Sequence, residues 1–358
     1  MLTRILGLAT ALPPTTVAQS DALEMAIPFT CSTPEEERTL RVLYRRSGVQ
    51  RRASVLLEPG GGAPRFFPPP SAPGDRGPAT SARMARYEQE IGPLAVAAAR
   101  AALADAGLLA EEIGQLVTVS CTGFVAPNFD VRLIKELGLP ADTGRTHVGF
   151  MGCQGALNGL RVADALARRP PHRGVLLVAA ELCSLHYQYG FDPDQTVANA
   201  LFADGAAAVV LGADGDNRGW HLHASGAWLL PHCEDAMTWR IGDHGFTMTL
   251  AARVPELIAA HLRPAVEGWL GQHGLALGDI PTWAVHPGGP RILSATCEAL
   301  GLPSEATAIS REILAQCGNM SSPTILFILD RLRRAGAALP CVALAFGPGL
   351  SAEAALFQ

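Results

Sequence analysis

The order of elements predicted in the first half of the chain recurs in its second half, and this internal repeat restricts the folds available to it. The apolar runs expected to form buried strands pair off as 116–121 with 282–285, 174–180 with 342–346, and 201–211 with 348–357. Each half also contains a central helix, one beginning after Cys153 and one opening with Asn319. Strands alternating with helices predict an α/β fold. Two equivalent halves would bring the starts of these two helices together.

The repeat implies a division of the chain into two similar halves. We expect residues 1–220 to carry a candidate nucleophile and residues 221–358 to carry a candidate histidine and asparagine, with the polar stretch Asp214–Arg218 near the boundary. At 358 residues and 48% hydrophobic content, the chain can bury a large core.

Cys153 is the candidate nucleophile. A short apolar run with Val148 and Phe150 leads into Gly152, and a long apolar-periodic segment follows the cysteine. This pattern predicts a strand-to-helix turn. Unpaired N–H groups and the positive end of the helix dipole would favour the thiolate and lower the thiol pKa. The alternative is a buried structural cysteine, which is the commoner role of a free cysteine.

Two further polar residues lie at predicted element ends. His286 follows an apolar strand and precedes the open turn Pro287-Gly288-Gly289, whereas Asn319 follows Gly318 at the start of a helical pattern. Alone, the histidine could be structural and the asparagine a helix N-cap. Together with a cysteine, they form a set able to activate a thiolate and to donate hydrogen bonds to a thioester oxygen.

Composition and spacing exclude several other classes. A net charge of −5 gives no general attraction to nucleic acid or to an anionic membrane, and no stretch approaches the length of a membrane span. The eight cysteines are dispersed without metal-ligand spacing, so we expect no metal site and a reducing, cytoplasmic location. The run from Arg4 to Leu12 is short for a signal peptide, and a buried strand is preferred there. The dinucleotide and Walker-type glycine patterns are absent from the sequence.

A basic cluster that includes Arg45, Arg46 and Arg51 leaves two interpretations open. The cluster is either a solvated helix face or a collar for a phosphate-bearing ligand.

Several segments along the chain resemble those of one protein family. The chain resembles the type III polyketide synthases, the chalcone-synthase-like family, and in particular its bacterial members. The matching segments occur in family order and cover nearly the whole chain: ILGLATALPP at 5–14, GFMGCQGA at 149–156, ALFADGAAAVV at 200–210, HPGGPRIL at 286–293, GNMSSPTILFILD at 318–330 and FGPGLSAEAAL at 346–356. The resemblance implies a thiolase-like fold, a layered αβαβα arrangement built from two similar halves, and a homodimer. It also implies CoA thioesters as substrates, with no cofactor.

The resemblance assigns catalytic roles to three residues. Cys153 would accept the starter acyl group, and His286 would keep the cysteine as a thiolate. His286 and Asn319 would then hydrogen-bond the thioester carbonyl of malonyl-CoA during decarboxylation. The cluster of Arg45, Arg46 and Arg51 resembles the basic CoA entrance of the family.

The resemblance also identifies substrate-binding positions. Phe202 matches a gatekeeper phenylalanine, and Met248 occupies the position of the second gatekeeper, where Phe246 could compensate. Cys121 and Tyr187 resemble cavity walls of bacterial members, and Ala126 replaces a methionine that commonly reaches into the partner's cavity. The remaining candidates are Ser321, Gly347, Pro348 and Gly349, from the GNMSS and FGPGL segments.

The expected reaction is the iterative decarboxylative condensation of malonyl-CoA onto an acyl-CoA starter through a cysteine thioester. Cyclisation would then give a pyrone, a resorcinol or a related phenolic. The alternative is a β-ketoacyl synthase III-type enzyme that performs one condensation, with the extender supplied by an acyl carrier protein. The terminal FGPGL segment favours the polyketide branch.

Overall fold

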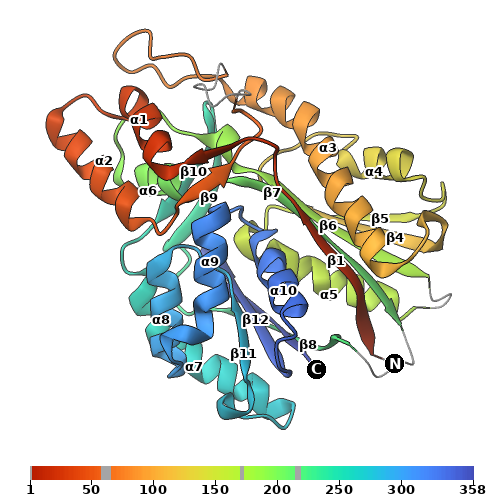
Figure 1. Cartoon of the computed structure of the whole chain (residues 1–358). Helices are drawn as coiled ribbons and strands as arrows, with labels where there is room; N and C mark the ends of the chain where they lie inside the picture. Colours follow the sequence, from red (N-terminus) through yellow and green to blue (C-terminus); the bar gives the residue numbers. More distant parts are fainter. Residues whose placement is uncertain (1, 58–65, 170–172, 214–218) are drawn as a thin grey trace.

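The computed structural model describes residues 2–57, 66–169, 173–213 and 219–358, and the polar stretch 214–218 lies outside them. Within these residues, nine strands form one large sheet in the order β11-β12-β13-β8-β1-β7-β6-β4-β5 (Figure 1). Their bounds are β1 (Thr3–Ala11), β4 (Ile113–Ser120), β5 (Gly144–Gly149), β6 (Gly174–Leu182), β7 (Asp204–Ala213), β8 (His221–Leu229), β11 (Thr282–Val285), β12 (Cys341–Gly347) and β13 (Ser351–Phe357). The strand expected near the N-terminus is β1, which lies inside the sheet.

Strand directions confirm the internal repeat. In the first half β4 runs parallel to β6. Strand β7 then pairs antiparallel with β6 on one side and with β1 on the other. In the second half β11 runs parallel to β12, and β12 to β13 and β13 to β8 are antiparallel pairs. The two half-sheets join where the start of β1 pairs with β8.

Helices cover both faces of each half-sheet. The central layer holds α5 (Gly155–Ala167) and α10 (Thr324–Arg334), which pack against strands of both halves. The outer layers are α3 (Thr80–Ala106) with α4 (Phe129–Leu137) on the first half, and α7 (Val254–Gln272) with α8 (Pro290–Leu300) on the second (Figure 1). The αβαβα arrangement expected from the resemblance is therefore confirmed.

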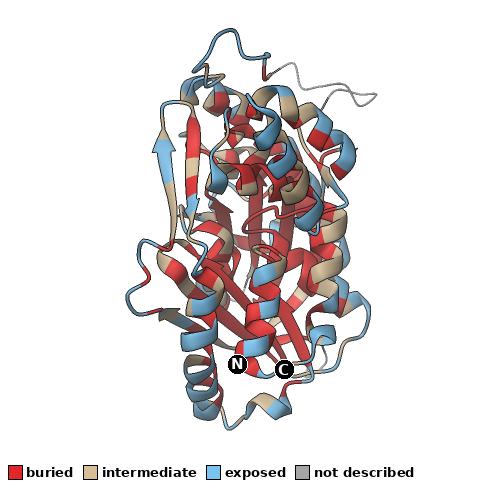
Figure 2. Ribbon diagram, turned by 90° about the vertical axis from the view of Figure 1, so that its left-hand side faces the viewer, coloured by how far each residue is buried: buried red, intermediate tan, exposed pale blue. Residues whose placement is uncertain are grey.

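Alternating side chains along the strands build the cores between these layers. On β6, Leu177 and Ala179 belong to the central core with α5 and α10, whereas Leu176 and Val178 face α3. This alternation follows from the two-residue period of a strand. The strands consequently carry almost continuous apolar sequence and are buried on both sides (Figure 2).

Smaller elements cover the end of the sheet where the strands carry the polar candidates. They are β2 (Thr16–Ala18), α1 (Gln19–Thr30), α2 (Pro34–Arg46), β3 (Arg51–Ala53), α6 (Pro193–Leu201), β9 (Met237–Gly242), β10 (Gly245–Leu250) and α9 (Ala308–Cys317). Short 3-10 turns complete the chain: η1 (Ala110–Glu112), η2 (Gly152–Gln154), η3 (Cys183–His186), η4 (Leu277–Asp279), η5 (Ser304–Thr307) and η6 (Pro348–Leu350). No helix in the described ranges is long and apolar enough to cross a membrane.

The close packing of β1 on α3 gives a testable consequence. A Cβ added at Gly7 would lie 2.3 Å from the carbonyl oxygen of Ala102 and 2.6 Å from the backbone nitrogen of Ala106. Backbone atoms cannot move aside cheaply, so Gly7→Ala should lower the free energy of unfolding by about 1 to 3 kcal/mol. Gly268→Ala is the control, because Gly268 is exposed on α7 and its Cβ would meet nothing within 4 Å. Denaturant unfolding measures both, and an unchanged Gly7→Ala midpoint would contradict the packing.

Candidate active site

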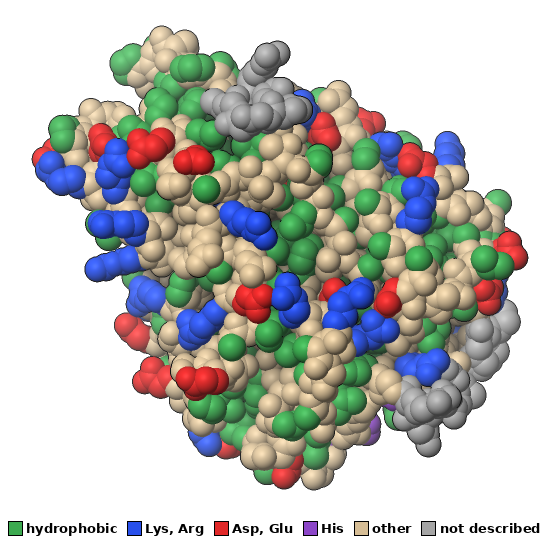
Figure 3. Space-filling view, viewed as in Figure 1, with side chains coloured by type: hydrophobic (Ala, Val, Ile, Leu, Met, Phe, Trp, Pro, Cys, Tyr) green, Lys and Arg blue, Asp and Glu red, His purple; other side chains and the backbone are tan. Residues whose placement is uncertain are grey.

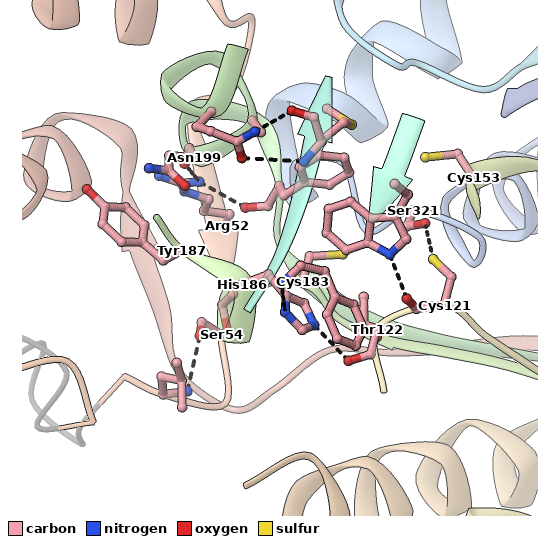
Figure 4. Close-up of a pocket in the computed structure, with 18 of the residues that line it drawn as sticks. Arg52, Ser54, Cys121, Thr122, Cys153, Cys183, His186, Tyr187, Asn199 and Ser321 are labelled. Carbon is pink, nitrogen blue, oxygen red and sulfur yellow. Dashed lines mark hydrogen bonds between the residues drawn. The ribbon is translucent and has the colours of Figure 1, made fainter. Parts of the chain in front are cut away.

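A cavity lies at the covered end of the sheet and brings together most of the predicted substrate-binding residues. Its empty space is about 1280 Å³, including the opening to solvent. Seven sequence-predicted residues line it: Cys121, Cys153, Tyr187, Phe202, Met248, Ser321 and Pro348. Cys121, Cys153 and Ser321 lie at one side of the view and Arg52 and Tyr187 at the other (Figure 4).

Cys153 lies in η2, immediately before α5, so the predicted strand-to-helix turn is confirmed. Gly152 has φ +74°, and a Cβ there would lie 2.3 Å from Cδ of Pro348. Both the left-handed backbone and the contact with η6 therefore require glycine at this position. This contact joins the nucleophile's turn to the second half of the chain.

The environment of the Cys153 sulfur raises its pKa. Burial raises the thiol pKa to about 11, hydrogen bonds with the Ser321 and Asn319 side chains act to lower it, and the charge of Glu181 raises it. The expectation that the helix start lowers this pKa is wrong for the resting site, because loss of solvation outweighs the helix N-terminus. The pKa of the Cys153 thiol therefore lies above its ordinary value in the resting site.

His286 is buried at the end of β11, as predicted. Its backbone N–H donates to the carbonyl of Leu344 on β12 at 2.8 Å. Both ring nitrogens are buried and have no hydrogen-bond partner among the described residues. Burial lowers the imidazole pKa to about 3. A buried imidazole without a partner is unusual and points to a role in which it receives or donates a proton.

Asn319 does not open a helix, contrary to the prediction. It forms an isolated bridge with Phe202, donating its N–H to the Leu201 carbonyl and accepting from the N–H of Ala203, both at 2.9 Å. Helix α10 begins only at Thr324, because Ser321 has φ +60° and interrupts the helical path. The Asn319 side-chain oxygen accepts from the Ser321 N–H at 2.8 Å, and the Asn319 side chain acts to lower the pKa of the Cys153 thiol.

Glu181, which no sequence motif singled out, is a fully buried carboxylate at the end of β6. It accepts hydrogen bonds from the Cys121 N–H at 2.9 and 3.0 Å and from three hydroxyl groups: Ser120 at 3.2 Å, Thr122 at 2.6 Å and Ser322 at 2.6 Å. Burial raises its pKa. The available sequence signal was a charged residue at the end of the apolar run Val175–Leu182.

The gatekeeper region agrees in part with the expectations. Phe202 lines the cavity, and Arg52 donates to its carbonyl at 2.8 Å and to that of Asn199 at 2.6 Å. Both Met248 and Phe246 line the cavity. Cys121 contacts Ser321 through Sγ and Oγ at 3.4 Å.

Other predicted residues lie outside the cavity lining. Ala126 is exposed in the loop after β4, and Gly347 and Gly349 flank the lining residue Pro348. Arg45, Arg46 and Arg51 are exposed and none of them lines the cavity, whereas Arg52 does. Arginine side chains gather over α2 at the left of Figure 3. No group of three or more His, Cys, Asp or Glu side chains in the described part of the chain could hold a metal ion.

The charge of Glu181 should be measurable at Cys153. Because that charge raises the thiol pKa, Glu181→Gln should shift the pH midpoint of Cys153 alkylation by iodoacetamide to lower pH. Peptide mass spectrometry follows the reaction at this cysteine. Glu353→Gln is the control, because Glu353 interacts with Asn158 and Arg161. A midpoint that stays or rises in Glu181→Gln would contradict the electrostatic assignment.

Comparisons with known proteins identify the family. Residues 2–215 match the family described as "Chalcone and stilbene synthases, N-terminal domain", and residues 221–358 match the corresponding C-terminal domain. The chain is 36% identical over 362 residues to an alpha-pyrone synthesis polyketide synthase-like protein of Mycobacterium tuberculosis, covering 98% of this chain and 90% of the relative. It is 39% identical over 367 residues to 1,3,6,8-tetrahydroxynaphthalene synthase of Streptomyces peucetius, covering 99% and 93%.

Solved structures agree with this result. The polyketide synthase PKS-I from the brown alga Ectocarpus siliculosus superposes with a TM-score of 0.93 at 32% identity, covering 100% of this chain and 98% of that one. The C-terminal type III polyketide synthase domain of a hybrid from Dictyostelium gives 0.90 at 26% identity, covering 100% and 99%. These findings favour the polyketide synthase over the single-condensation ketosynthase. The chain therefore belongs to the chalcone and stilbene synthase family, the type III polyketide synthases, and is a Claisen-condensing acyltransferase with a thiolase-like fold.

Proposed function

We propose that this enzyme loads an acyl-CoA starter onto Cys153, extends it repeatedly with malonyl-CoA and cyclises the chain to a pyrone, a resorcinol or a related phenolic. The observation that carries the proposal is a large cavity whose wall holds Cys153 beside Cys121 and Ser321. The names of two relatives, one for alpha-pyrone synthesis and one a tetrahydroxynaphthalene synthase, support this product class.

Starter loading begins from two neutral groups. His286 takes the Cys153 proton, and the thiolate attacks the thioester carbonyl of the starter. The new carbon–sulfur bond joins the acyl group to Cys153, the bond to CoA breaks, and the CoA thiol leaves with the proton from His286. It is unfavourable to charge either the buried Cys153 thiol or the buried His286 imidazole alone. Transfer of the proton from Cys153 to His286 during the attack therefore avoids an isolated charge.

Extension uses the same polar groups as donors. The Asn319 NH₂ group and the N–H of His286 would donate to the thioester oxygen of malonyl-CoA while CO₂ leaves and the enolate charge develops there. The resulting carbanion attacks the acyl group on Cys153, forming a carbon–carbon bond and releasing the sulfur. The orientation of the Asn319 amide, with its oxygen engaged by the Ser321 N–H, supports this role.

CoA thioesters are the proposed substrates, with no separate cofactor, and the proposed compartment is the cytoplasm. Arg45, Arg46 and Arg51 are proposed contacts for the CoA phosphates, because they remain exposed at the end of α2 and the start of β3. Arginine guanidinium groups suit phosphate recognition.

We also propose a homodimer. Four exposed apolar side chains form the proposed contact patch: Phe124 in the loop that carries Ala126, Met151 beside the turn of Cys153, Leu229 at the end of β8 and Ile241 on β9. Phe124 stacks on Phe150 at 4.6 Å and both rings contact Phe246, which pairs with Ile241 across β9 and β10. A second copy of the chain is the occupant that fits best, because β5 beside this patch is an edge strand with an unpaired side.

The reaction test uses purified enzyme with malonyl-CoA and a panel of short, long and aromatic acyl-CoAs, without carrier protein, followed by product mass. Multiply extended products are expected, and Cys153→Ala should abolish them.

His286→Ala should reduce the rate of malonyl decarboxylation by about two to three decades. At high pH it should reduce the rate of starter loading less, because hydroxide can then deprotonate the Cys153 thiol. Absence of multiply extended products from every starter, or equal losses in both steps, would reject the mechanism.

The dimer is tested by sedimentation. Ile241→Asp places a charge in the apolar patch and should move the protein from dimer to monomer. Leu109→Asp is the matched control, because Leu109 is equally exposed but lies near η1. A monomeric wild type, or equal behaviour of the two variants, would show that this patch does not join two copies.

A further inference from the structure

Strands β9 and β10 form a two-stranded ribbon that lies between the cavity and solvent. On one face of the ribbon, Trp239 of β9 and Phe246 and Met248 of β10 line the cavity. On the other face, Arg240 and Thr249 are exposed. The ribbon pairs with no further strand in the described part of the chain. Because an isolated pair of strands is marginally stable in water, groups outside the ribbon must hold it in place.

Side chains, and not a third strand, bond the free edge of β10. Nε2 of Gln188 donates to the Phe246 carbonyl at 3.2 Å, and the Phe246 N–H donates to Nδ1 of His186 at 3.0 Å. At the end of the strand, the N–H of Leu250 donates to the Asp194 carboxylate at 3.4 Å. The position of this edge therefore depends on side-chain hydrogen bonds.

One side chain bonds both backbone groups of Met248, at the centre of this edge. Nε2 of Gln195 donates to the Met248 carbonyl, and Oε1 of Gln195 accepts from the Met248 N–H at 3.4 Å. Gln195 lies in the first turn of α6, which packs beside β10 (Figure 1). That turn is itself fixed, because the Asp192 carboxylate accepts from the N–H groups of Asp194 and Gln195 at 3.1 and 3.0 Å. A single amide group thus takes the place of a neighbouring strand.

Without this amide, Met248 has a different set of partners available. Met248 is buried, so its N–H and carbonyl would have no partner on that side and would have to bond water. Water drawn to this edge would enter the wall of the cavity that also contains Cys153. The Gln195 amide therefore keeps this part of the wall dry.

We propose that Gln195 is a positioning residue that protects the acyl group on Cys153 from hydrolysis by seating β10 as a closed wall. This inference rests on the proposed function. In the hydrolysis, the water oxygen bonds to the acyl carbon, the carbon–sulfur bond breaks and one water proton goes to the Cys153 sulfur, so a carboxylic acid leaves. Exclusion of water from a closed site suppresses such loss of a reactive intermediate. Gln195 acts through Met248 on the lifetime of the acyl-enzyme.

The lifetime of the acyl-enzyme is the direct test. Purified enzyme is loaded, without malonyl-CoA, with the acyl-CoA of the panel that loads the wild type fastest, and intact-protein mass follows the loss of the acyl group from Cys153. Gln195→Met keeps the length of the side chain but loses both hydrogen bonds, and should shorten the lifetime by about fivefold or more. Gln195→Glu keeps only the acceptor and should shorten it too. Gln316→Met is the matched control, because Gln316 is a half-buried helix residue that bonds Glu312 and does not line the cavity.

Hydrogen–deuterium exchange separates the seating of β10 from general damage. Peptides that cover β10 should exchange faster in Gln195→Met, whereas peptides that cover β6 and β7 should exchange as in the wild type. The rate at which Cys153 is first acylated should change less than the lifetime does, because the Gln195 amide is engaged with Met248.

The outcomes distinguish this inference from the proposed function. A wild type that never acquires an acyl group on Cys153 would reject the proposed function itself. A wild type that loads, together with an unchanged acyl lifetime in both Gln195 variants, would reject the role given to Gln195. Loss of the folded state in both variants, seen in thermal melts, would show a general structural role and would also overturn the inference.

Discussion

The site depends on one contact between the two halves of the chain. Gly152 packs against Pro348, and Gly347 packs against Met151 and Gln154, so η2 with the nucleophile is seated on the end of β12. β12 also holds the backbone of His286 through Leu344. A backbone contact of this kind tolerates no added Cβ, which explains the glycines on both sides. In the proposed mechanism the repeat therefore has a functional consequence: the first half supplies Cys153, and the second half supplies His286 and Asn319.

Burial is the main influence on the pKa values of Cys153 and His286. The Cys153 thiol has a raised pKa and His286 a lowered one, both chiefly because water is excluded. Neither charge is stable alone, and a proton moved between the two groups creates opposite charges together. In the proposed mechanism the His286 imidazole, whose ring nitrogens have no partner among the described residues, takes that proton when a thioester arrives.

Buried polar networks hold the cavity in shape. Glu181 accepts hydrogen bonds from four groups, which lie at and after the end of β4 and just before α10. The His186 ring bonds the backbone of Thr122 and of Phe246. Such groups are costly to bury unless every bond is made, so each of them commits its neighbours to one arrangement. The walls around Cys153 are thus set by polar bonds within an apolar lining, and this explains how a cavity of this size stays open.

Much of the fold could be read from local pattern. Apolar runs of strand length, their repeated order and the glycine beside Cys153 depend on side-chain periodicity and backbone freedom, which are properties of neighbouring residues. The sequence by itself therefore determined the two repeated α/β halves and the candidate nucleophile, whereas the αβαβα layering was implied by the family resemblance. The tertiary structure alone decided the pKa direction of Cys153, the extended pairing of Asn319 with Phe202, and the parts played by Glu181 and His186. These depend on burial and on partners about 60 or more residues away, and solvent exclusion and long-range hydrogen bonds leave no periodic signal in a sequence.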